Sequence, residues 1–456
     1  MPKKTEQNTD ATLVNRLNRR VRRSTARWSA EPPQPFGETL QLHRFTLGNG
    51  LRVRIVADRS APVLSYHTWY RVGSRHETEG KTGLAHLFEH LMFNETRRIP
   101  YGHFDFLIES AGGESNASTW TDWTQYHAEL PASELAMIAE IEAQRMGELV
   151  LRAPQVSSEK EVVANERRQR VDDDVEGLAG EMLYATAFRK HPYHWPTIGW
   201  MQDIEGFTPT DCERFYRRYY APNNATIVIV GDVDLEQALR CVSRSYGHLK
   251  PARLPRERKI TEPAQRSERV RELCWPTAAP KLLLGYRACG LSDPDFDVLT
   301  VLNDVMFGGR GSRLFRKLVR DREFLTELNG TIAPFRDPGL YEMWLSLRAG
   351  VAIDDVLSTV EQELTRLQHE PISVEELARS CNRLELSFVQ SLETAAGKAD
   401  QLGFYETVLG DGSQLFARAH SYKRVTPADV MRVARRYLKP TRRTRVHVLP
   451  AEEASA

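Results

Sequence analysis

The chain has 456 residues, with 62 basic and 61 acidic side chains and a formal net charge of +1. This balance argues against nucleic acid or an anionic membrane as the main partner. A chain of this length exceeds what one hydrophobic core normally supports, so we expect two or more domains. It contains no run of 18 apolar residues, and we therefore expect no membrane-spanning segment.

The five cysteines are odd in number and widely spaced, which fits neither a disulfide framework nor a zinc cluster. Scattered thiols suit a reducing compartment. We therefore expect a cytoplasmic protein, with an organelle or the periplasm as the alternative. The cysteines are Cys212, Cys241, Cys274, Cys289 and Cys381.

Residues 1–37 are polar and Arg-rich and end in a Pro-rich stretch, without the apolar core of a secretory signal. Leu13, Leu17 and Val21 recur at helical spacing among arginines, so a basic targeting helix is one interpretation. We expect instead a flexible basic arm, or an arm that contacts a partner.

Several segments beyond the arm have a clear period. Residues 51–56 and 64–70 read as strands, and residues 134–150 read as a helix. Residues 114–130 alternate and are rich in Thr, Trp and Tyr, which is typical of a strand.

The most informative segment lies in a helical pattern over residues 83–94. His86 and His90 stand at i and i+4 with Glu89 at i+3, so the three share one helix face. Two imidazoles one turn apart can bind one zinc ion, and H-x-x-E-H is the inverted form of a zinc-protease motif. Glu89 would be the base that activates a zinc-bound water. The alternative is a helix with two surface histidines, but the flanking apolar residues favour a partly buried site.

A zinc site that keeps a reactive water needs a third protein ligand. Glu159 and Glu166 lie two turns apart on one face of a second helix, which Ser158 and Glu161 are predicted to open with a capping box. The alternative here is a charged helix face in solvent.

The chain also contains an internal repeat at an offset of 218 residues. Thr208–Asp211 matches Thr426–Asp429, and Arg217–Tyr219 matches Arg435–Tyr437. Each copy reads as a capped helix, a Pro break and a strand. Two copies indicate two related domains rather than a solenoid. We predict an arm at 1–37, a zinc-bearing domain at 38–252 and a homologous domain at 253–456.

The second copy is predicted to lack a metal site, because the offset replaces all three motif residues. His86, Glu89 and His90 map onto Asp304, Phe307 and Gly308. The glycine-rich run 308–311 lacks the G-K-[ST] ending of a phosphate loop and reads as a turn. Ser373 and Glu376 are predicted to cap a helix over 374–393.

These features together resemble the inverted-zincin metallopeptidases, the family of pitrilysin, insulin-degrading enzyme and mitochondrial processing peptidase. In that family about 75 residues separate the motif from a ligand Glu, and residues 91–165 supply that spacing here. A second Glu stands seven residues before the ligand, as Glu159 does. Further matching blocks are Leu47–Leu51, Val72–Arg75, Gly112–Gly113, Asn116–Thr119, His191–Tyr193, Ala221–Thr226 and Gly231–Asp232.

The resemblance implies an α+β protein of two homologous domains, each a mostly antiparallel sheet packed with helices, arranged as half of a clamshell. It implies one Zn²⁺ per chain held by His86, His90 and Glu166, although such a site also suits manganese or cobalt. It places Glu89 and Glu159 in the catalytic set. Asn116 and Ala117 would bind a peptide that adds to their edge strand, which favours broad specificity. A structural Asn at a bulge is the alternative for Asn116.

The chain departs from the family at one pair of positions. Single-chain members carry an Arg and a Tyr, seven residues apart, that complete the active site from the second domain. Val319 and Thr326 occupy these positions here, and neither can stabilise an oxyanion as that pair would. The resemblance therefore implies a homologous partner subunit that supplies the Arg and Tyr, as in two-chain members of the family.

Three functions remain in competition. The first is a zinc endopeptidase that is the catalytic subunit of a heterodimer. The second is a non-catalytic structural subunit of a larger complex, which the complete ligand set disfavours. The third is a solitary homodimeric peptidase in which other residues replace the missing pair.

Overall fold

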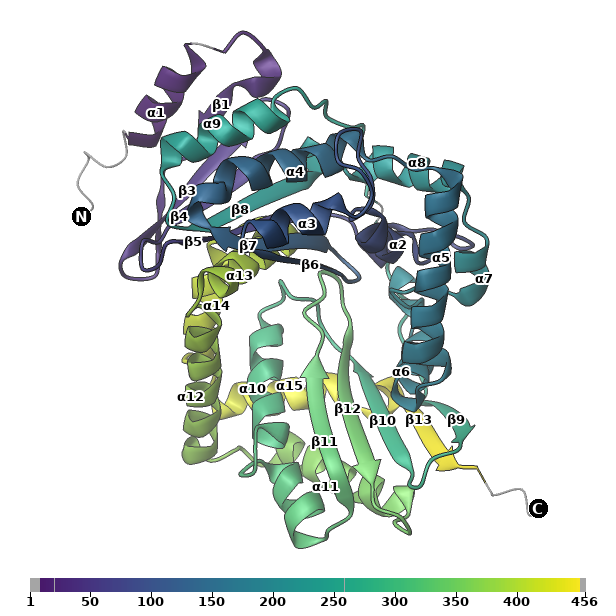
Figure 1. The fold of residues 1–456 in the computed structure, drawn as a ribbon. Helices are drawn as coiled ribbons and strands as arrows, with labels where there is room; N and C mark the ends of the chain where they lie inside the picture. Colours follow the sequence, from purple (N-terminus) through teal and green to yellow (C-terminus); the bar gives the residue numbers. More distant parts are fainter. Residues whose placement is uncertain (1–8, 20, 258, 452–456) are drawn as a thin grey trace. The chain divides into compact units, whose positions relative to one another are not determined.

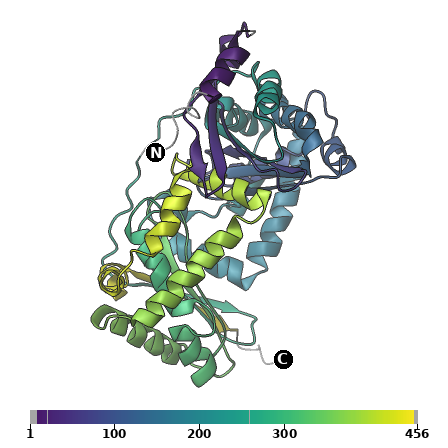
Figure 2. The same cartoon turned by 90° about the vertical axis from the view of Figure 1, so that its left-hand side faces the viewer.

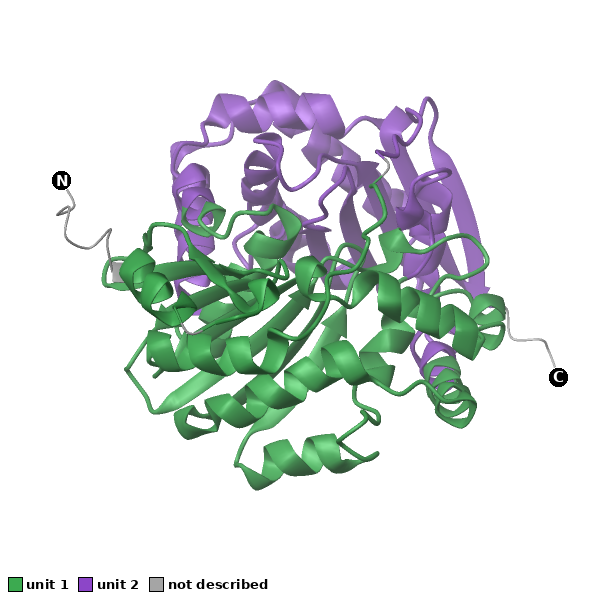
Figure 3. Cartoon of the chain, turned by 90° about the horizontal axis from the view of Figure 1, so that it is seen from above, with its two compact units in different colours: residues 1–164, 197–258, 391–416 green, residues 165–196, 259–390, 417–456 purple. Residues whose placement is uncertain are grey.

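The computed structural model describes residues 9–19, 21–257 and 259–451. It divides into two compact units, drawn in green and purple in Figure 3. Each unit has one β-sheet covered by helices (Figure 1), which confirms the expectation of an α+β protein with two domains. The first unit comprises residues 1–164, 197–258 and 391–416, and the second comprises residues 165–196, 259–390 and 417–456.

The sheet of the first unit is antiparallel except for the pair β4–β8. Its order is β1-β3-β4-β8-β5-β7-β6, with β2 paired to β3. β8 is buried along its whole length in the middle, and β6 is the last strand at one edge. The strands are β1 (Trp28–Ala30), β2 (Gln34–Phe36), β3 (Leu40–Leu47), β4 (Arg52–Ala57), β5 (Val63–Tyr70), β6 (Glu114–Thr119), β7 (Thr124–Pro131) and β8 (Ala225–Gly231).

Helices cover both faces of this sheet. Successive side chains of a strand point to opposite faces, so neighbouring residues of β5 contact different helices. Thr68 of β5 donates to Glu142 of α4 at 2.8 Å. The neighbouring Trp69 packs on the other face against Gly403 of α13, where a Cβ would lie 2.0 Å from the indole nitrogen. Figure 1 shows α3, α4 and α9 over one face. The helices are α1 (Thr9–Asn18), α2 (Leu84–Leu91), α3 (His103–Ser110), α4 (Leu135–Glu148), α5 (Ala153–Arg167), α7 (Met201–Glu205), α8 (Pro209–Tyr219), α9 (Leu235–Tyr246) and α13 (Ala395–Val408).

A buried ion pair also ties α13 to the first sheet. Arg54 of β4 donates to Glu406 of α13 at 2.6 Å, and the two side chains are only 6% and 3% exposed. Because each charge would be costly to bury alone, the position of α13 depends on this pair as well as on apolar packing.

The second unit has a five-stranded sheet in the order β11-β12-β10-β13-β9, in which only β13–β9 is parallel among the described pairs. Helix α6 packs on β9, β10 and β13. The long helices α11 and α12 follow one another along the chain, in green and yellow-green in Figure 2. The elements are α6 (Val175–Ala187), β9 (Arg269–Trp275), β10 (Lys281–Arg287), α10 (Asp295–Phe307), β11 (Leu325–Ile332), β12 (Leu340–Leu347), α11 (Ile353–His369), α12 (Val374–Ser391), α14 (Gln414–Tyr422), α15 (Pro427–Tyr437) and β13 (Arg443–Pro450).

The two sheets share one strand order. β4-β8-β5-β7-β6 in the first corresponds to β9-β13-β10-β12-β11 in the second, and each contains its parallel pair at the same place. Helices α8 and α15 both begin with a Thr-Pro step and a Thr–Asp capping box, as the sequence repeat predicted. The local structure therefore confirms the repeat. The predicted cap of α12 is also present, since Ser373 Oγ accepts from the backbone N–H of Glu376.

Neither compact unit is one continuous stretch of the chain, because each is built from three separate segments. The predicted boundary at 252/253 lies close to the break between units at 258/259 and stays a prediction about the two repeats. Residues 165–196, including α6, pack with the second unit, and residues 391–416, including α13, pack with the first. A sequence pattern locates helices but does not say which sheet each one covers.

The predicted flexible arm differs from the structure over its described part. Residues 9–18 form α1, and Val14 and Leu17 are buried in the core of the first unit. Of the apolar side chains predicted at helical spacing, Leu17 is buried and Leu13 packs against the same core. Asp10 also pairs with His43 at 2.9 Å. The first eight residues lie outside the described part of the chain.

Candidate metal centre

Helix α2 begins at a backbone turn that only glycine adopts easily. Gly83 has φ +95°, and a Cβ there would lie 2.5 Å from the carbonyl oxygen of Ile198. The buried Glu77 carboxylate accepts from the backbone N–H of Gly83 at 2.8 Å and of Ala85 at 2.7 Å. Burial raises the pKa of Glu77 to about 8, although these two bonds oppose the rise. Glu77 thus satisfies the first amides of the helix, which have no partner within it.

Apolar packing fixes the rotation of α2 about its axis. Phe88 stacks on Phe215, Tyr216 and Tyr220 with ring centroids 5.1 to 6.0 Å apart. Tyr126 donates from its hydroxyl to the carbonyl oxygen of Phe88 at 2.8 Å. The helix ends at Leu91 rather than at residue 94 as predicted.

The two motif histidines lie together on the side of α2 that this packing leaves free. Their ring centroids are 5.0 Å apart. His86 is 9% exposed as a residue, and the His90 side chain is 25% exposed. Glu89 stands beside His90 and is partly exposed.

Glu166 reaches the same place from α5. One ligand atom from each of His86, His90 and Glu166 lies within 4.8 Å of the others. Two imidazoles and one carboxylate form a donor set found in catalytic zinc sites with three protein ligands and one open position. The residues present therefore fit the metal that the sequence predicted, and their assignment as ligands stays a prediction.

Helix α5 begins at Ala153, so the predicted start at Ser158 is wrong. Pro154 near the first turn suits a helix start, because proline has no N–H to leave unsatisfied there. Gln155 Oε1 accepts from the backbone N–H of Arg152 at 3.1 Å, in place of the predicted capping box. The two glutamates still lie on one helix, so the error does not affect the site.

Glu159 lies behind His90. Its Oε2 is 3.8 Å from His90 Nδ1, and its Oε1 accepts from Asn94 Nδ2 at 2.9 Å. A carboxylate at Nδ1 orients the ring and leaves Nε2 for a metal. The catalytic role of Glu159 stays a prediction, and its position would suit a residue that orients His90.

Three residues near the motif escaped the sequence analysis. Asn94 stands four residues after His90, and Arg170 stands four after Glu166 with its guanidinium 3.1 Å from Glu166 Oε1. The i, i+4 spacing was a usable signal for both. Glu77 contacts α2 from outside the helix, and no spacing rule pointed to it.

The predicted substrate strand is a hairpin. β6 and β7 are joined by a turn in which Trp120 N–H donates to the carbonyl oxygen of Trp123 at 2.9 Å. The prediction of one strand over 114–130 is wrong because this turn contains no Gly or Pro to mark it. Asn116 is exposed on β6 opposite His127 of β7, and Ala117 is buried. β6 pairs with β7 alone among the described strands, so its other edge can accept a strand.

Val319 and Thr326 line one cavity in the second unit, with a volume of about 1080 Å³. Val319 lies on the π-helical turn η8 (Phe315–Asp321) and Thr326 on β11. Thr326 Oγ1 donates to the carbonyl oxygen of Ser346 at 3.2 Å. Two cations, Arg170 and Lys281, line the same cavity.

Within the described residues, no helix combines the length and apolar character needed to span a bilayer. This agrees with the absence of an 18-residue apolar run in the sequence.

Comparison with known proteins agrees with this geometry. Residues 52–199 match the family model described as insulinase (peptidase family M16), and residues 206–384 match the model described as peptidase M16 inactive domain. Zinc protease PqqE of Helicobacter pylori is 30% identical over 416 residues, which make up 89% of this chain and 92% of that protein. The probable mitochondrial-processing peptidase subunit beta of Arabidopsis thaliana is 25% identical, over 86% of this chain and 75% of that protein.

Among solved structures, the crystal structure of a protease from Helicobacter pylori matches with a TM-score of 0.85 and 29% identity, covering 90% of this chain and 99% of that one.

Proposed function

The chain belongs to peptidase family M16, and on this premise we propose that it is a zinc-dependent endopeptidase. The observation that carries the proposal is the convergence of His86, His90 and Glu166 within 4.8 Å. Homologues named zinc proteases support the choice of metal. A subunit with a purely structural role would have no need to keep this donor set.

The residues around the group divide the work of peptide hydrolysis. Zinc, when bound, would lower the pKa of a coordinated water so that a nucleophile forms at neutral pH. Glu89 would accept the proton of the attacking water and pass it to the leaving amine. Glu159 would hold His90 in its ligating orientation. The free edge of β6 would bind the peptide backbone as an added strand, with Asn116 and Ala117 beside the scissile bond.

We further propose that the active enzyme contains a homologous second subunit. Val319 and Thr326 supply neither a guanidinium nor a phenol for the substrate carbonyl, so a partner with an Arg and a Tyr would complete the site. Loss of one such donor typically costs about 10²- to 10³-fold in turnover.

The experiment is cleavage of an unstructured peptide by the chain alone and then with increasing amounts of a homologous subunit that carries the Arg and Tyr. Activity should rise by about 10²-fold or more with the partner. The matched control is the same partner with its Tyr replaced by Phe, which should undo the gain.

Full activity in a preparation shown by mass spectrometry to contain only this chain would reject the two-subunit proposal. The solitary alternative would then gain support, and Arg170 and Lys281 of the same cavity would be the cations to replace. Zinc binding without cleavage under every condition would favour the non-catalytic alternative.

A further inference from the structure

A fully buried ion pair lies in the first unit on α4. The side chains of Glu142 and Arg145 are 1% and 0% exposed, and they contact one another directly. Glu142 also accepts from Thr68 Oγ1 at 2.8 Å. Hydrophobic residues of similar volume would often give at least equal stability at such a place, so stability alone does not explain the pair.

The Arg145 guanidinium is enclosed by three aromatic rings. Its central carbon lies 5.1 Å from the ring centre of Phe93, 4.2 Å from that of Phe104 and 4.7 Å from that of Tyr126. Distances below about 6 Å over an aromatic face are attractive, more so without solvent. The planar cation therefore holds together three elements, since Phe93 follows α2, Phe104 belongs to α3 and Tyr126 belongs to β7.

Two of these rings lead directly to the motif helix. Tyr126 donates its hydroxyl proton to the carbonyl oxygen of Phe88, one residue before Glu89. Phe93 stands three residues after His90, just beyond the end of α2. The last carbonyl groups of a helix carry partial negative charge, which a nearby cation stabilises. The guanidinium therefore reaches α2 through these two rings, one bonded to the helix backbone and one just beyond its last residue.

We propose that Arg145 is a positioning residue of the metal centre, which holds the last turn of α2 so that Glu89 and His90 keep their working orientation. Glu142 keeps Arg145 in place through their ion pair and the bond to Thr68. Arg145 touches neither substrate nor metal, because its side chain is enclosed in the core. The inference rests on the proposed peptidase function.

The test uses Arg145→Met in whichever preparation cleaves peptide, the chain alone or with its partner. We expect a fall of about 10- to 100-fold in kcat or in zinc affinity, as for residues that orient metal ligands. KM should stay within about twofold, because the change affects the chemical step rather than peptide binding. Zinc affinity is measured by competition with a chelator, well below the unfolding temperature.

The matched control is Arg54→Met, which breaks the buried pair with Glu406 in the same unit. It should lower thermal stability for the same reason but leave kcat and zinc affinity of the folded protein unchanged. An equal loss of kcat in both variants would mean that stability alone is responsible and would overturn the inference.

A double variant, Glu142→Gln with Arg145→Met, guards against simple misfolding. It removes the carboxylate left without a counter-ion, so stability should recover in part. The loss of kcat or zinc affinity should persist. Recovery of both to the wild-type values would also overturn the inference. Failure of the proposed function is distinguishable, because wild-type protein would then cleave no peptide under any condition, whether or not it binds zinc.

Discussion

Glu159 Oε2 lies 3.8 Å from His90 Nδ1. We predict that Glu159→Gln, which keeps the shape but loses the charge, weakens zinc binding or activity by about 10- to 100-fold. Chelator competition and peptide cleavage measure the two effects. Glu161→Gln, on the same helix but outside the group, is the control. Unchanged zinc affinity and activity would show that Glu159 does not orient His90.

The donor set predicts the metal content directly. Purified protein should hold close to one zinc per chain, and His90→Ala or Glu166→Ala should lose most of it, because two remaining ligands bind zinc poorly. Mass spectrometry of the metal provides the measurement. His248→Ala, which removes a partly exposed imidazole elsewhere, should keep the zinc. Unaltered content in both ligand variants would reject the assignment.

If Glu89 is the general base, its replacement should slow the cleavage step without weakening the binding of zinc or peptide. Glu89→Gln cannot accept a proton, so it should keep zinc and peptide binding and lose about 10²-fold or more in kcat. Single-turnover cleavage at saturating enzyme measures the chemical step. Near-normal turnover by this variant would remove Glu89 from the mechanism.

Acid should destabilise the first unit through His67. This side chain is buried on β5, 5.3 Å from the ring centre of His127, and burial lowers its pKa to about 3. The unfolded chain binds the proton near pH 6.5, whereas the folded chain does not. The free energy of unfolding therefore has its full contribution from neutral His67 above about pH 6.5. It decreases as the pH falls from about 6.5 to about 3, by up to about 1.4 kcal/mol per pH unit.

Urea titrations at several pH values measure this dependence. His67→Gln should flatten the profile between about pH 6.5 and 3, because the titrating group is gone. His248→Gln, at a partly exposed site, should leave it as steep as in the wild type. A His67→Gln profile as steep as that of the wild type would assign the acid sensitivity to other groups.

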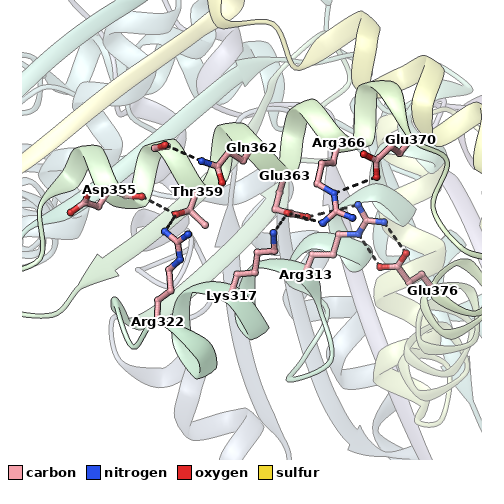
Figure 4. Close-up of polar contacts among 11 residues, drawn as sticks. Arg313, Lys317, Arg322, Asp355, Thr359, Gln362, Glu363, Arg366, Glu370 and Glu376 are labelled. Carbon is pink, nitrogen blue, oxygen red and sulfur yellow. Dashed lines mark hydrogen bonds and ion pairs between the residues drawn. The ribbon is translucent and has the colours of Figure 1, made fainter.

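In the second unit, one buried carboxylate lies among three cationic side chains (Figure 4). Glu363 is 1% exposed and contacts Lys317 of η8, with Arg366 at 3.4 Å and Arg313 at 3.9 Å. Glu363→Gln removes the shared partner of these cations and should cost about 1.5–3 kcal/mol, because Lys317 and Arg366 reach solvent and Arg313 keeps its bond to Glu376. Calorimetry should show an earlier unfolding transition.

Glu370→Gln provides the control for that change, because Glu370 is 61% exposed and pairs with the same Arg366 at 3.3 Å. A surface pair of this kind is worth about 0–1 kcal/mol. An equal loss of stability in the two variants would mean that burial does not make the Glu363 ion pairs stronger than the exposed Glu370 pair.

The parts of the molecule that the sequence predicted well depend on local spacing. His86 and His90 share a helix face wherever their helix lies, and the Thr–Asp caps of α8 and α15 are contained within four residues. Glu166 was found by its distance along the chain in a known family, not by geometry.

The parts that failed depend on contacts between distant segments. The start of α5 is set by Gln155 and Pro154 rather than by Ser158, although both starts obey capping rules. The turn between β6 and β7 has no glycine, and its Asp122 is held by Arg75 from a different segment. Glu77 caps α2 across a loop. Local preference cannot rank such alternatives, because tertiary partners decide between them.

The exchange of segments between the two units constrains how the protein can be made. The chain passes from one unit to the other five times, so no single cut separates them. A fragment that ends at residue 252 would lack α13, which covers the Trp69 face of the first sheet and supplies the counter-ion of Arg54. During synthesis, the Trp69 face of the first sheet stays uncovered after residue 252 until α13 has been made. This requires about 160 further residues, or roughly 10 to 30 s at typical elongation rates. A nascent-chain chaperone would have its longest opportunity to bind during that interval.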